Sequence, residues 1–389
     1  MARRHITPPD LLIPPGDLPP APKRSFRWAS ERGAVRCIGL AVVAIVLALP
    51  FFNNSAYLMT ILASAMIYVM MAMGLNVVVG HAGLLDLGYI AFYAVGAYTS
   101  GILTTRLGLS QVQALPFVVL VCLLAGVIIG GPTLRLRSDY LAIVTLGFGE
   151  IIRITANNLS ITGGPSGIYA IPGWEFFGWR LRDGFTVAGL RFDGMTTFYY
   201  FTAAVVIVFG VLGVSQIGRG KMGRAWKAVR DDEDAAEAMG INTYKAKITA
   251  YMIGAVWAGL AGQLMATQNA AISPNSFQFL NSALILMAVV LGGMGSMPGV
   301  VIGALFISLA PEFLRQWAEW RFLIFGLLLI LVMLFRPQGV WPSTKVLPWS
   351  RGGPRRRRPP DGPPTPGGAI SPAPADGAAD GAKTAEAAP

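Results

Sequence analysis

The chain contains little charge for its length. Charged residues make up 13% of its 389 residues, hydrophobic residues make up 54%, and the mean hydropathy is +0.56. The chain also contains long apolar runs, and these runs together with the low charge content exclude a soluble globular protein. A helix needs about 20 apolar residues to cross the hydrocarbon core, so the sequence predicts several crossings. Alternating strands of ~10 residues are absent, which favours a helical bundle over a β-barrel.

Residues that carry chemistry are also scarce. The two cysteines, Cys37 and Cys122, lie in apolar runs and show neither a disulfide framework nor metal-ligand spacing. The two histidines, His5 and His81, belong to no catalytic constellation. The motifs G-x-x-x-x-G-K-[ST], H-E-x-x-H and G-x-S-x-G are missing. We therefore expect no catalytic residue, no metal, no cofactor and no enzyme activity, and any ATP hydrolysis would belong to another subunit.

The net charge of +11 is concentrated in three segments: the N-terminal region, the run 219–240 and the C-terminal region. Basic clusters beside apolar segments are typical of cytoplasmic loops, so we expect contact with membrane lipid and not with nucleic acid. Residues 1–33 are proline-rich, and residues 342–389 are basic and then rich in Pro, Gly and Ala. We expect both to be disordered cytoplasmic tails around a transmembrane domain at 34–341. The first apolar run lacks a clear cleavage site, so we expect it to be kept as a membrane helix.

The apolar segments predict an all-α polytopic bundle of about ten membrane helices, with about eight or nine as alternatives. They lie at roughly 35–52, 56–79, 88–105, 112–131, 139–157 and 197–215, and then at 246–268, 280–293, 298–311 and 321–336. With a cytoplasmic N-terminus, four crossings precede Arg135 and Arg137, and six crossings precede the run 219–240. Both numbers are even, so all of these basic residues lie in the cytoplasm, as the positive-inside rule requires. The protein would be multi-pass with both termini cytoplasmic.

The run 219–240 is the long charged segment in the middle of the apolar chain. Its alanines favour helix, and the acidic residues Asp231, Asp232 and Glu233 suit the start of a second helix. Gly240 is placed to end that second helix. We expect two short cytoplasmic helices that meet at an elbow and are offered to a partner. The alternative is a solvated loop that only orients the flanking spans.

Two glycine-rich breaks share the pattern V/L-G-x-x-G: one carries Gly80 and Gly83, and the other carries Gly292 and Gly295. Broken helices in corresponding positions of two halves can mark an inverted repeat whose freed backbone groups face a substrate. The positive end of a half-helix would suit an amino acid's carboxylate. The alternative is two turns whose small residues let helices pack closely.

Glu150 and Arg153 lie three residues apart within an apolar segment, on one helical face. Charges at membrane depth are costly, so such residues face protein or a water-filled path. Glu150 would line the external mouth of a substrate path, or the two residues would form a structural ion pair near the interface.

The segment 158–196 is expected to be the long external loop. Thr162, Gly163 and Gly164 open a turn, and Trp174 begins an aromatic cluster. These residues would form a docking surface for an extracytoplasmic protein, or the aromatics would anchor at the lipid headgroups.

The combined motifs resemble the permeases of branched-chain (hydrophobic) amino-acid ABC importers, and specifically the longer of the two permeases in such systems. The likeness covers roughly 55–345. It is carried by GLNVVVGHAGLLDLGYIAFYAVGAYTS at 74–100, LRLRSDYLAIVTLGFGEIIRI and TGGPSGI within 134–168, GRAWKAVRDDEDAAEAMGI at 223–241, VVLGGMGSMPGVVIGAL at 289–305 and LFRPQG at 334–339.

The resemblance implies a complex of two related permeases, two ATP-binding subunits and a periplasmic solute-binding protein, in the inner membrane. This chain would form half of the path for amino acids, by alternating access. The family's Glu-Ala-Ala-x-x-x-Gly loop docks on the ATP-binding subunit, and here it begins with Asp in place of Glu and lacks the later Ile and Leu-Pro. The implied coupling residues are Arg224, Arg230, Asp234, Ala235, Ala236 and Gly240.

The sequence is also compatible with two other functions. Permeases for urea or short amides are very similar, and no residue separates them from amino-acid permeases. An ion-coupled secondary transporter would need no ATP-binding subunit, but acids at membrane depth are nearly absent beyond Glu150.

Overall fold

A computed structural model describes residues 56–134, 138–176, 179–180, 185–187, 190–192 and 194–314, with scattered positions up to 341. The chain divides into two compact units, Met1–Lys345 and Val346–Pro389, and every described residue belongs to the first. The expected spans at 35–52 and 321–336, both tails, Arg135 and Arg137 fall wholly or largely outside the described residues.

The predicted all-α polytopic bundle is confirmed. Its main helices are α2 (Ala56–Leu75), α3 (Ile90–Arg106), α4 (Gln111–Thr133), α5 (Ser138–Asn158), α6 (Gly194–Arg219), α9 (Thr243–Asn269), α10 (Phe279–Gly292) and α11 (Met297–Phe313). Within the described residues, four segments are long and apolar enough to cross a membrane: Tyr57–His81, Gln111–Thr133, Phe198–Gly218 and Thr243–Asn269. Two shorter apolar helices are α10 and α11. The total number of crossings stays a prediction.

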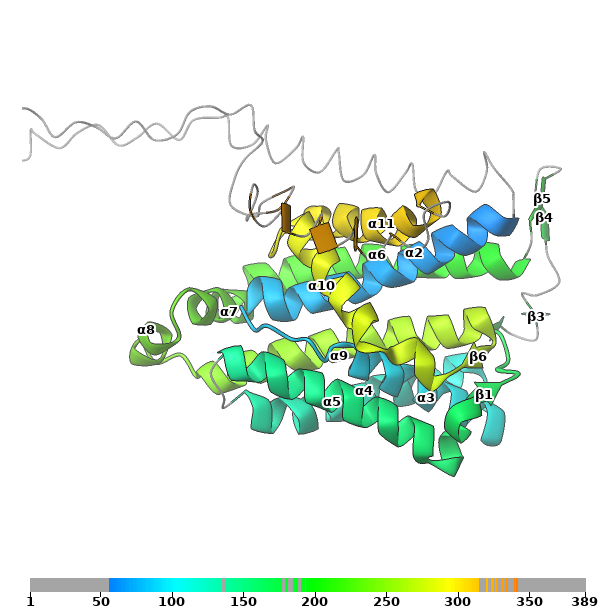
Figure 1. Cartoon of the computed structure of the whole chain (residues 1–389), viewed down its shortest axis with the longest axis horizontal. Helices are drawn as coiled ribbons and strands as arrows, with labels where there is room; N and C mark the ends of the chain where they lie inside the picture. Colours follow the sequence, from blue (N-terminus) through cyan, green and yellow to red (C-terminus); the bar gives the residue numbers. More distant parts are fainter. Residues whose placement is uncertain are drawn as a thin grey trace, which may run out of the picture. The chain divides into compact units, whose positions relative to one another are not determined.

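Helix α9 lies at the centre of the bundle and contacts α2, α3, α4 and α6 (Figure 1). Small residues make this possible. A Cβ added at Gly96 of α3 would overlap the backbone of Gly259 on α9, and one added at Gly262 would overlap the carbonyl of Tyr93. Lipid tails are as apolar as side chains, so close backbone approach is a main source of helix association in membranes.

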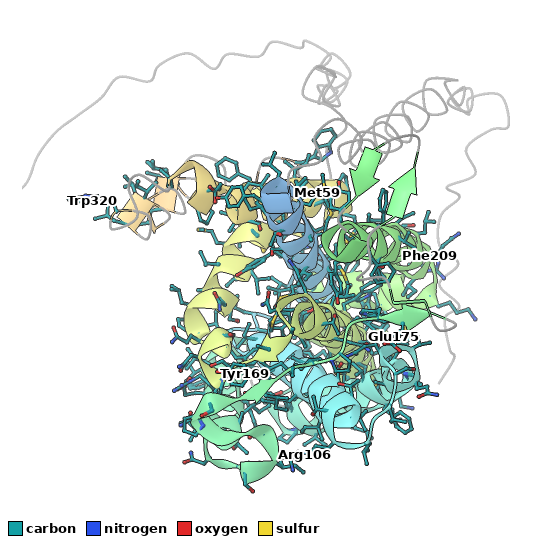
Figure 2. All side chains as sticks on the ribbon, turned by 90° about the vertical axis from the view of Figure 1, so that its right-hand side faces the viewer. Met59, Arg106, Tyr169, Glu175, Phe209 and Trp320 are labelled. Carbon is teal, nitrogen blue, oxygen red and sulfur yellow. The ribbon has the colours of Figure 1, made fainter. Side chains whose placement is uncertain are left out.

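Large apolar side chains cover the outward faces of α4, α5 and α6. Figure 2 shows Phe209 of α6 pointing outward, and this residue is 69% exposed. Other exposed residues are Leu120, Leu124, Ile128, Ile143, Ile151, Val205 and Leu212. Such faces suit lipid or another apolar subunit.

The two ends of the bundle differ (Figure 1). One end carries the short helices α7 (Lys221–Asp231) and α8 (Glu233–Ala238). At the other end, β1 (Ile168–Tyr169) pairs antiparallel with β6 (Ala271–Ile272). The segment expected as one loop also forms two antiparallel pairs, β2 (Glu175–Phe176) with β3 (Trp179–Arg180) and β4 (Phe185–Val187) with β5 (Leu190–Phe192). Short 3₁₀ turns are η2 (Ser160–Thr162), η3 (Gly164–Ser166) and η5 (Pro274–Phe277).

Candidate functional site

The charged run 219–240, called here the coupling segment, folds as the two helices predicted from its sequence. Asp232 lies between them, and its carboxylate accepts a hydrogen bond from the backbone N–H of Ala235 at 3.0 Å. Gly240 has a φ of 81° just beyond α8, and Ile241 donates to the carbonyl of Ala236 at 3.0 Å. The acidic elbow is thus a helix cap, and the glycine ends the helix in the left-handed conformation.

One face of the coupling segment is anchored to the bundle. Trp226 is fully buried, and its indole N–H donates to the carbonyl of Ala246 on α9 at 2.9 Å. Its ring meets the edge of His81 with 6.4 Å between centroids. Lys247 of α9, itself buried, forms an ion pair with Glu233 at the start of α8. These contacts fix α7 and α8 on the end of α9.

The opposite face is exposed. Arg224, Asp234 and Ala235 lie on it, and Met239 at its end is 83% exposed. Ala236, by contrast, is buried against the bundle. Of the predicted coupling residues, Ala236 therefore has a packing role here, and the neighbouring residues present the surface.

Arg230 connects α7 to the first glycine-rich break. There α2 continues as a π-helix, η1 (Asn76–His81), and the Arg230 guanidinium donates to the carbonyl of Gly80. Gly83 follows with a φ of 73°, and a Cβ added there would lie 2.8 Å from Arg230 Cγ. A π-helical turn often marks a functional position because its backbone departs from the α-helical ladder. Arg230 thus holds the point where the spanning helix loses its regular geometry.

The two glycine-rich breaks lie against each other. The fully buried Asn76 accepts a hydrogen bond from the backbone N–H of Gly295 at 2.8 Å through its Oδ1. Its amide nitrogen faces Met297 Sδ at 3.6 Å. A Cβ added at Gly80 would overlap Asn76 Oδ1 and the N–H of Gly295. Gly292, at the end of α10, packs on Gly299 instead. The predicted pair of breaks is therefore one structural node, called here the break node.

Sequence reasoning missed a buried acid within the first glycine-rich break. Asp86 is 1% exposed, and its Oδ1 accepts a hydrogen bond from the backbone N–H of Gly88 at 2.8 Å. Its Oδ2 makes no hydrogen bond of normal geometry within the described residues, and the buried hydroxyl of Tyr251, which also lacks such a bond, lies near it. The signal available in the sequence was a single carboxylate inside an apolar stretch.

Glu150 and Arg153 form the expected ion pair on α5, with Arg153 Nε donating to Glu150 Oε1 at 2.9 Å. Their side chains are 41% and 25% exposed, on the outward surface of this chain. The structure does not bring Glu150 to the break node.

The four residues expected to dock an external protein split into two groups. Gly163 is exposed beside Pro165, whereas Thr162 and Gly164 are buried. Trp174 differs from the expectation, because it is 7% exposed and its indole N–H donates to Thr267 Oγ1 on α9 at 3.2 Å. A buried indole needs such a partner, so Trp174 belongs to the interior and not to a docking surface.

Comparison with known proteins supplies a family. The model of the family described as "Branched-chain amino acid transport system / permease component" matches residues 57–334. The chain is 40% identical to the high-affinity branched-chain amino acid transport system permease protein LivM of Salmonella typhimurium, over 88% of this chain and 81% of the relative. It is 42% identical to the LivM protein of Escherichia coli, over 79% and 75%.

A second type of permease matches at lower identity. The LivH protein of Escherichia coli is 26% identical, over 72% of this chain and 92% of the relative. No solved structure matches the chain.

Proposed function

The chain belongs to the family of branched-chain amino acid transport permeases, and on that premise we propose that it is an inner-membrane permease subunit of an ATP-driven importer for branched-chain or other hydrophobic amino acids. The matched residues include the described helices from Tyr57 onward, the break node and the coupling segment. The chain is a multi-pass membrane protein, and it would form half of the translocation path by alternating access.

The observation that carries this proposal is the coupling segment, which is anchored on one face and exposed on the other. An ATP-binding subunit would dock on the exposed face around Asp234 and Ala235. Its movement would pass along α7 to the Gly80 carbonyl through Arg230. Because a ligand shifts a conformational equilibrium only through different affinities for the two states, each nucleotide state must favour one position of α7.

The proposed partners are a second, related permease, two ATP-binding subunits and a periplasmic solute-binding protein. Matches to both LivM and LivH proteins support the pairing of two related permeases. The end with α7 and α8 would face the cytoplasm, and the end with β1 and β6 would face the periplasm. The solute-binding protein would dock at the second end, near the exposed Gly163 and Pro165.

The orientation has a direct test. Single cysteines at Ser166 and Lys221, both exposed, should react with a membrane-impermeant maleimide from opposite sides. Labelling of both positions from one side would contradict the proposed topology.

The function is tested by uptake. The complex co-purified from native membranes with this chain is reconstituted in proteoliposomes with its solute-binding protein, and radiolabelled leucine uptake is measured with ATP, without ATP and under an ion gradient. Uptake that requires ATP is the expected result. Uptake by this chain alone under an ion gradient would show a secondary transporter instead.

A further inference from the structure

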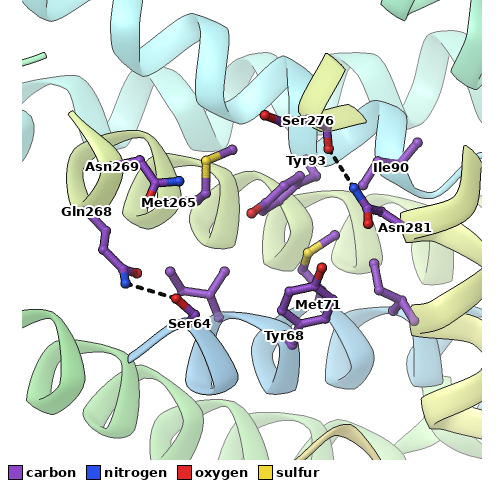
Figure 3. A pocket seen from close by; sticks show the side chains of 12 residues that line it. Ser64, Tyr68, Met71, Ile90, Tyr93, Met265, Gln268, Asn269, Ser276 and Asn281 are labelled. Carbon is purple, nitrogen blue, oxygen red and sulfur yellow. Dashed lines mark hydrogen bonds between the residues drawn. The ribbon is translucent and has the colours of Figure 1, made fainter. Parts of the chain in front are cut away.

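A cavity of about 250 Å³ lies between the central helix α9 and its neighbours, and no residue of the break node lines it. It is partly open to the outside, and its walls come from α2, α3, α9, α10 and the turn η5 (Figure 3). None of the glycines expected to face a substrate lines it. The lining residues are Ser64, Ile67, Tyr68, Met71, Ile90, Tyr93, Met265, Gln268, Asn269, Ser276, Asn281 and Ile285. We propose that this cavity binds the transported solute, an aliphatic amino acid in its zwitterionic form; the inference rests on the proposed function and assigns its substrate site.

The charge of the lining restricts the solute. None of the lining residues carries a carboxylate, an ammonium or a guanidinium group. A solute with a net charge would be left without a counter-charge at membrane depth, which is costly. A zwitterion has no net charge, and its two charged groups can be met by neutral hydrogen-bonding groups. The lining therefore disfavours basic and acidic amino acids.

Two tyrosine hydroxyls in the cavity lack a partner in the described part of the chain. Tyr93 is only 7% exposed, and its ring and that of Tyr68 point into the cavity (Figure 3). Buried tyrosine hydroxyls usually find a hydrogen-bond partner. A bound carboxylate would accept hydrogen bonds from both hydroxyls, and bonds to a charged group are the stronger kind.

The amide side chains of the cavity complement an ammonium group. Gln268 Nε2 donates to Ser64 Oγ at 3.0 Å, and Asn281 Nδ2 donates to the carbonyl of Ser276 at 2.8 Å. Gln268 Nε2 also donates to the carbonyl of Thr60 at 3.3 Å, so both of its N–H groups and one N–H of Asn281 are used within the protein. The carbonyl oxygens of the two amides accept from no described residue. An ammonium group supplies donors and no acceptors, which matches the free oxygen of Gln268. The free oxygen of Asn281 lies in the first turn of α10, whose partly positive end does not favour a cation.

Two helix ends add opposite polarity, because Gln268 lies at a partly negative end and Asn281 at a partly positive end. The last turn of α9 contributes Gln268 and Asn269, and the first turn of α10 contributes Asn281. A helix carries a partial negative charge at its C-terminus and a partial positive charge at its N-terminus. The cavity therefore lies between a partly negative and a partly positive end, which suits the two ends of a zwitterion.

The apolar wall selects the side chain. Ile67, Ile90 and Ile285 contribute branched aliphatic surface, and Met71 and Met265 contribute flexible thioethers. Methionines adapt to irregular shapes, so valine, leucine and isoleucine can share one site. The volume equals about eight waters at ~30 Å³ each, which is close to the heavy-atom size of these amino acids. Urea and short amides carry no aliphatic side chain that could contact the isoleucine wall, so the cavity favours the amino acid.

The test uses the full complex in proteoliposomes and a matched pair of tyrosines on α3. Tyr93→Phe removes a hydroxyl that faces the cavity. Tyr98→Phe removes a hydroxyl that is buried without a partner and does not line the cavity. Because a hydrogen bond to a charged group contributes about 1.5–3 kcal/mol, Tyr93→Phe should raise the KM for leucine uptake about tenfold or more. Tyr98→Phe should leave the KM unchanged.

A second variant separates substrate contact from a general structural defect. Ile285→Ala removes three carbon atoms from the apolar wall and enlarges the site. The ratio of phenylalanine uptake to leucine uptake should rise at least about threefold, a change that even one buried methylene group at about 0.8 kcal/mol would account for. The cavity assignment is wrong, and the proposed function stands, if three results occur together. The wild-type complex takes up leucine with ATP, Tyr93→Phe behaves like Tyr98→Phe, and Ile285→Ala keeps the uptake ratio. If the wild-type complex takes up urea and no aliphatic amino acid, both are wrong.

Discussion

The two glycine-rich breaks look alike in sequence but differ in structure. The first, at 80–88, follows a π-helix, contacts α7 through Arg230 and contains the buried Asp86. The second, at 292–299, is a tight turn in which Gly293 and Gly295 have positive φ, and it joins two short helices. Only the first has a described contact with the coupling segment. The second break contacts the first through the side chain of Asn76. A movement of α7 would therefore reach the first break directly and the second break through that one side chain.

The largest effect is expected where the first break meets α7. Gly83→Ala should reduce ATP-driven uptake at least about tenfold, because it adds a Cβ that lies 2.8 Å from Arg230 Cγ at a φ of 73°, and such backbone strain alone is of order 1–3 kcal/mol. Leucine uptake per ATP hydrolysed by the reconstituted complex measures this effect.

The control for this prediction is Gly295→Ala, whose φ is 84° and which belongs to the second break. It should lower stability by a similar amount and leave the uptake-to-hydrolysis ratio closer to wild type. Equal loss of coupling in both variants would mean that the two breaks respond to α7 alike.

A comparable effect is expected from removing the side chain that bridges α7 and the first break. Arg230→Ala loses the hydrogen bond to the Gly80 carbonyl, and a bond from a charged donor is worth about 1.5–3 kcal/mol. Hydrolysis should continue while uptake per ATP falls about tenfold. Lys227→Ala, an exposed residue of the same helix, removes the same charge and should keep wild-type coupling; matching losses in both variants would point to net charge and not to the bridge.

The link between the two breaks predicts a change in stability. Asn76→Ala leaves the N–H of Gly295 without its buried acceptor, which costs about 1–3 kcal/mol. The purified complex should unfold at a lower temperature than wild type. An unchanged unfolding temperature would mean that the node is held together by other contacts.

The smallest effect is expected at the anchor of α7. Trp226→Phe removes the hydrogen bond to the Ala246 carbonyl but keeps an aromatic ring against His81. A neutral hydrogen bond contributes about 0.5–1.5 kcal/mol, so a slight loss of thermal stability with normal coupling is predicted. A strong coupling defect in this variant would place the transmission at Trp226 and not at Arg230.

Sequence reasoning succeeded where the determinants are local. The acidic elbow with Asp232, the helix-ending Gly240 and the Glu150–Arg153 pair all depend on residues within a few positions of each other. Periodicity and hydropathy were also sufficient to predict the long helices, because a membrane helix forms its backbone hydrogen bonds within its own segment.

The remaining features depend on contacts between distant residues. Asn76 and Gly295 are 219 positions apart, and Trp174 and Thr267 are 93 positions apart. Trp174 was expected at the lipid headgroups or on a docking surface, because its sequence neighbours suggest an exposed segment, yet its N–H finds an acceptor on α9. The cavity is assembled from five elements, and no short motif encodes it.

The central claim is that an ATP-binding subunit docks on the exposed face of the coupling segment, and it is tested most directly by site-specific photo-crosslinking. A photoreactive amino acid replaces Ala235, which is exposed on α8, or Leu107, which is 66% exposed at the proposed periplasmic end. Irradiation of native membranes should join the chain to an ATP-binding subunit from position 235 and not from position 107. If position 235 forms no adduct with an ATP-binding subunit, in membranes from which the full complex co-purifies, the docking claim is wrong.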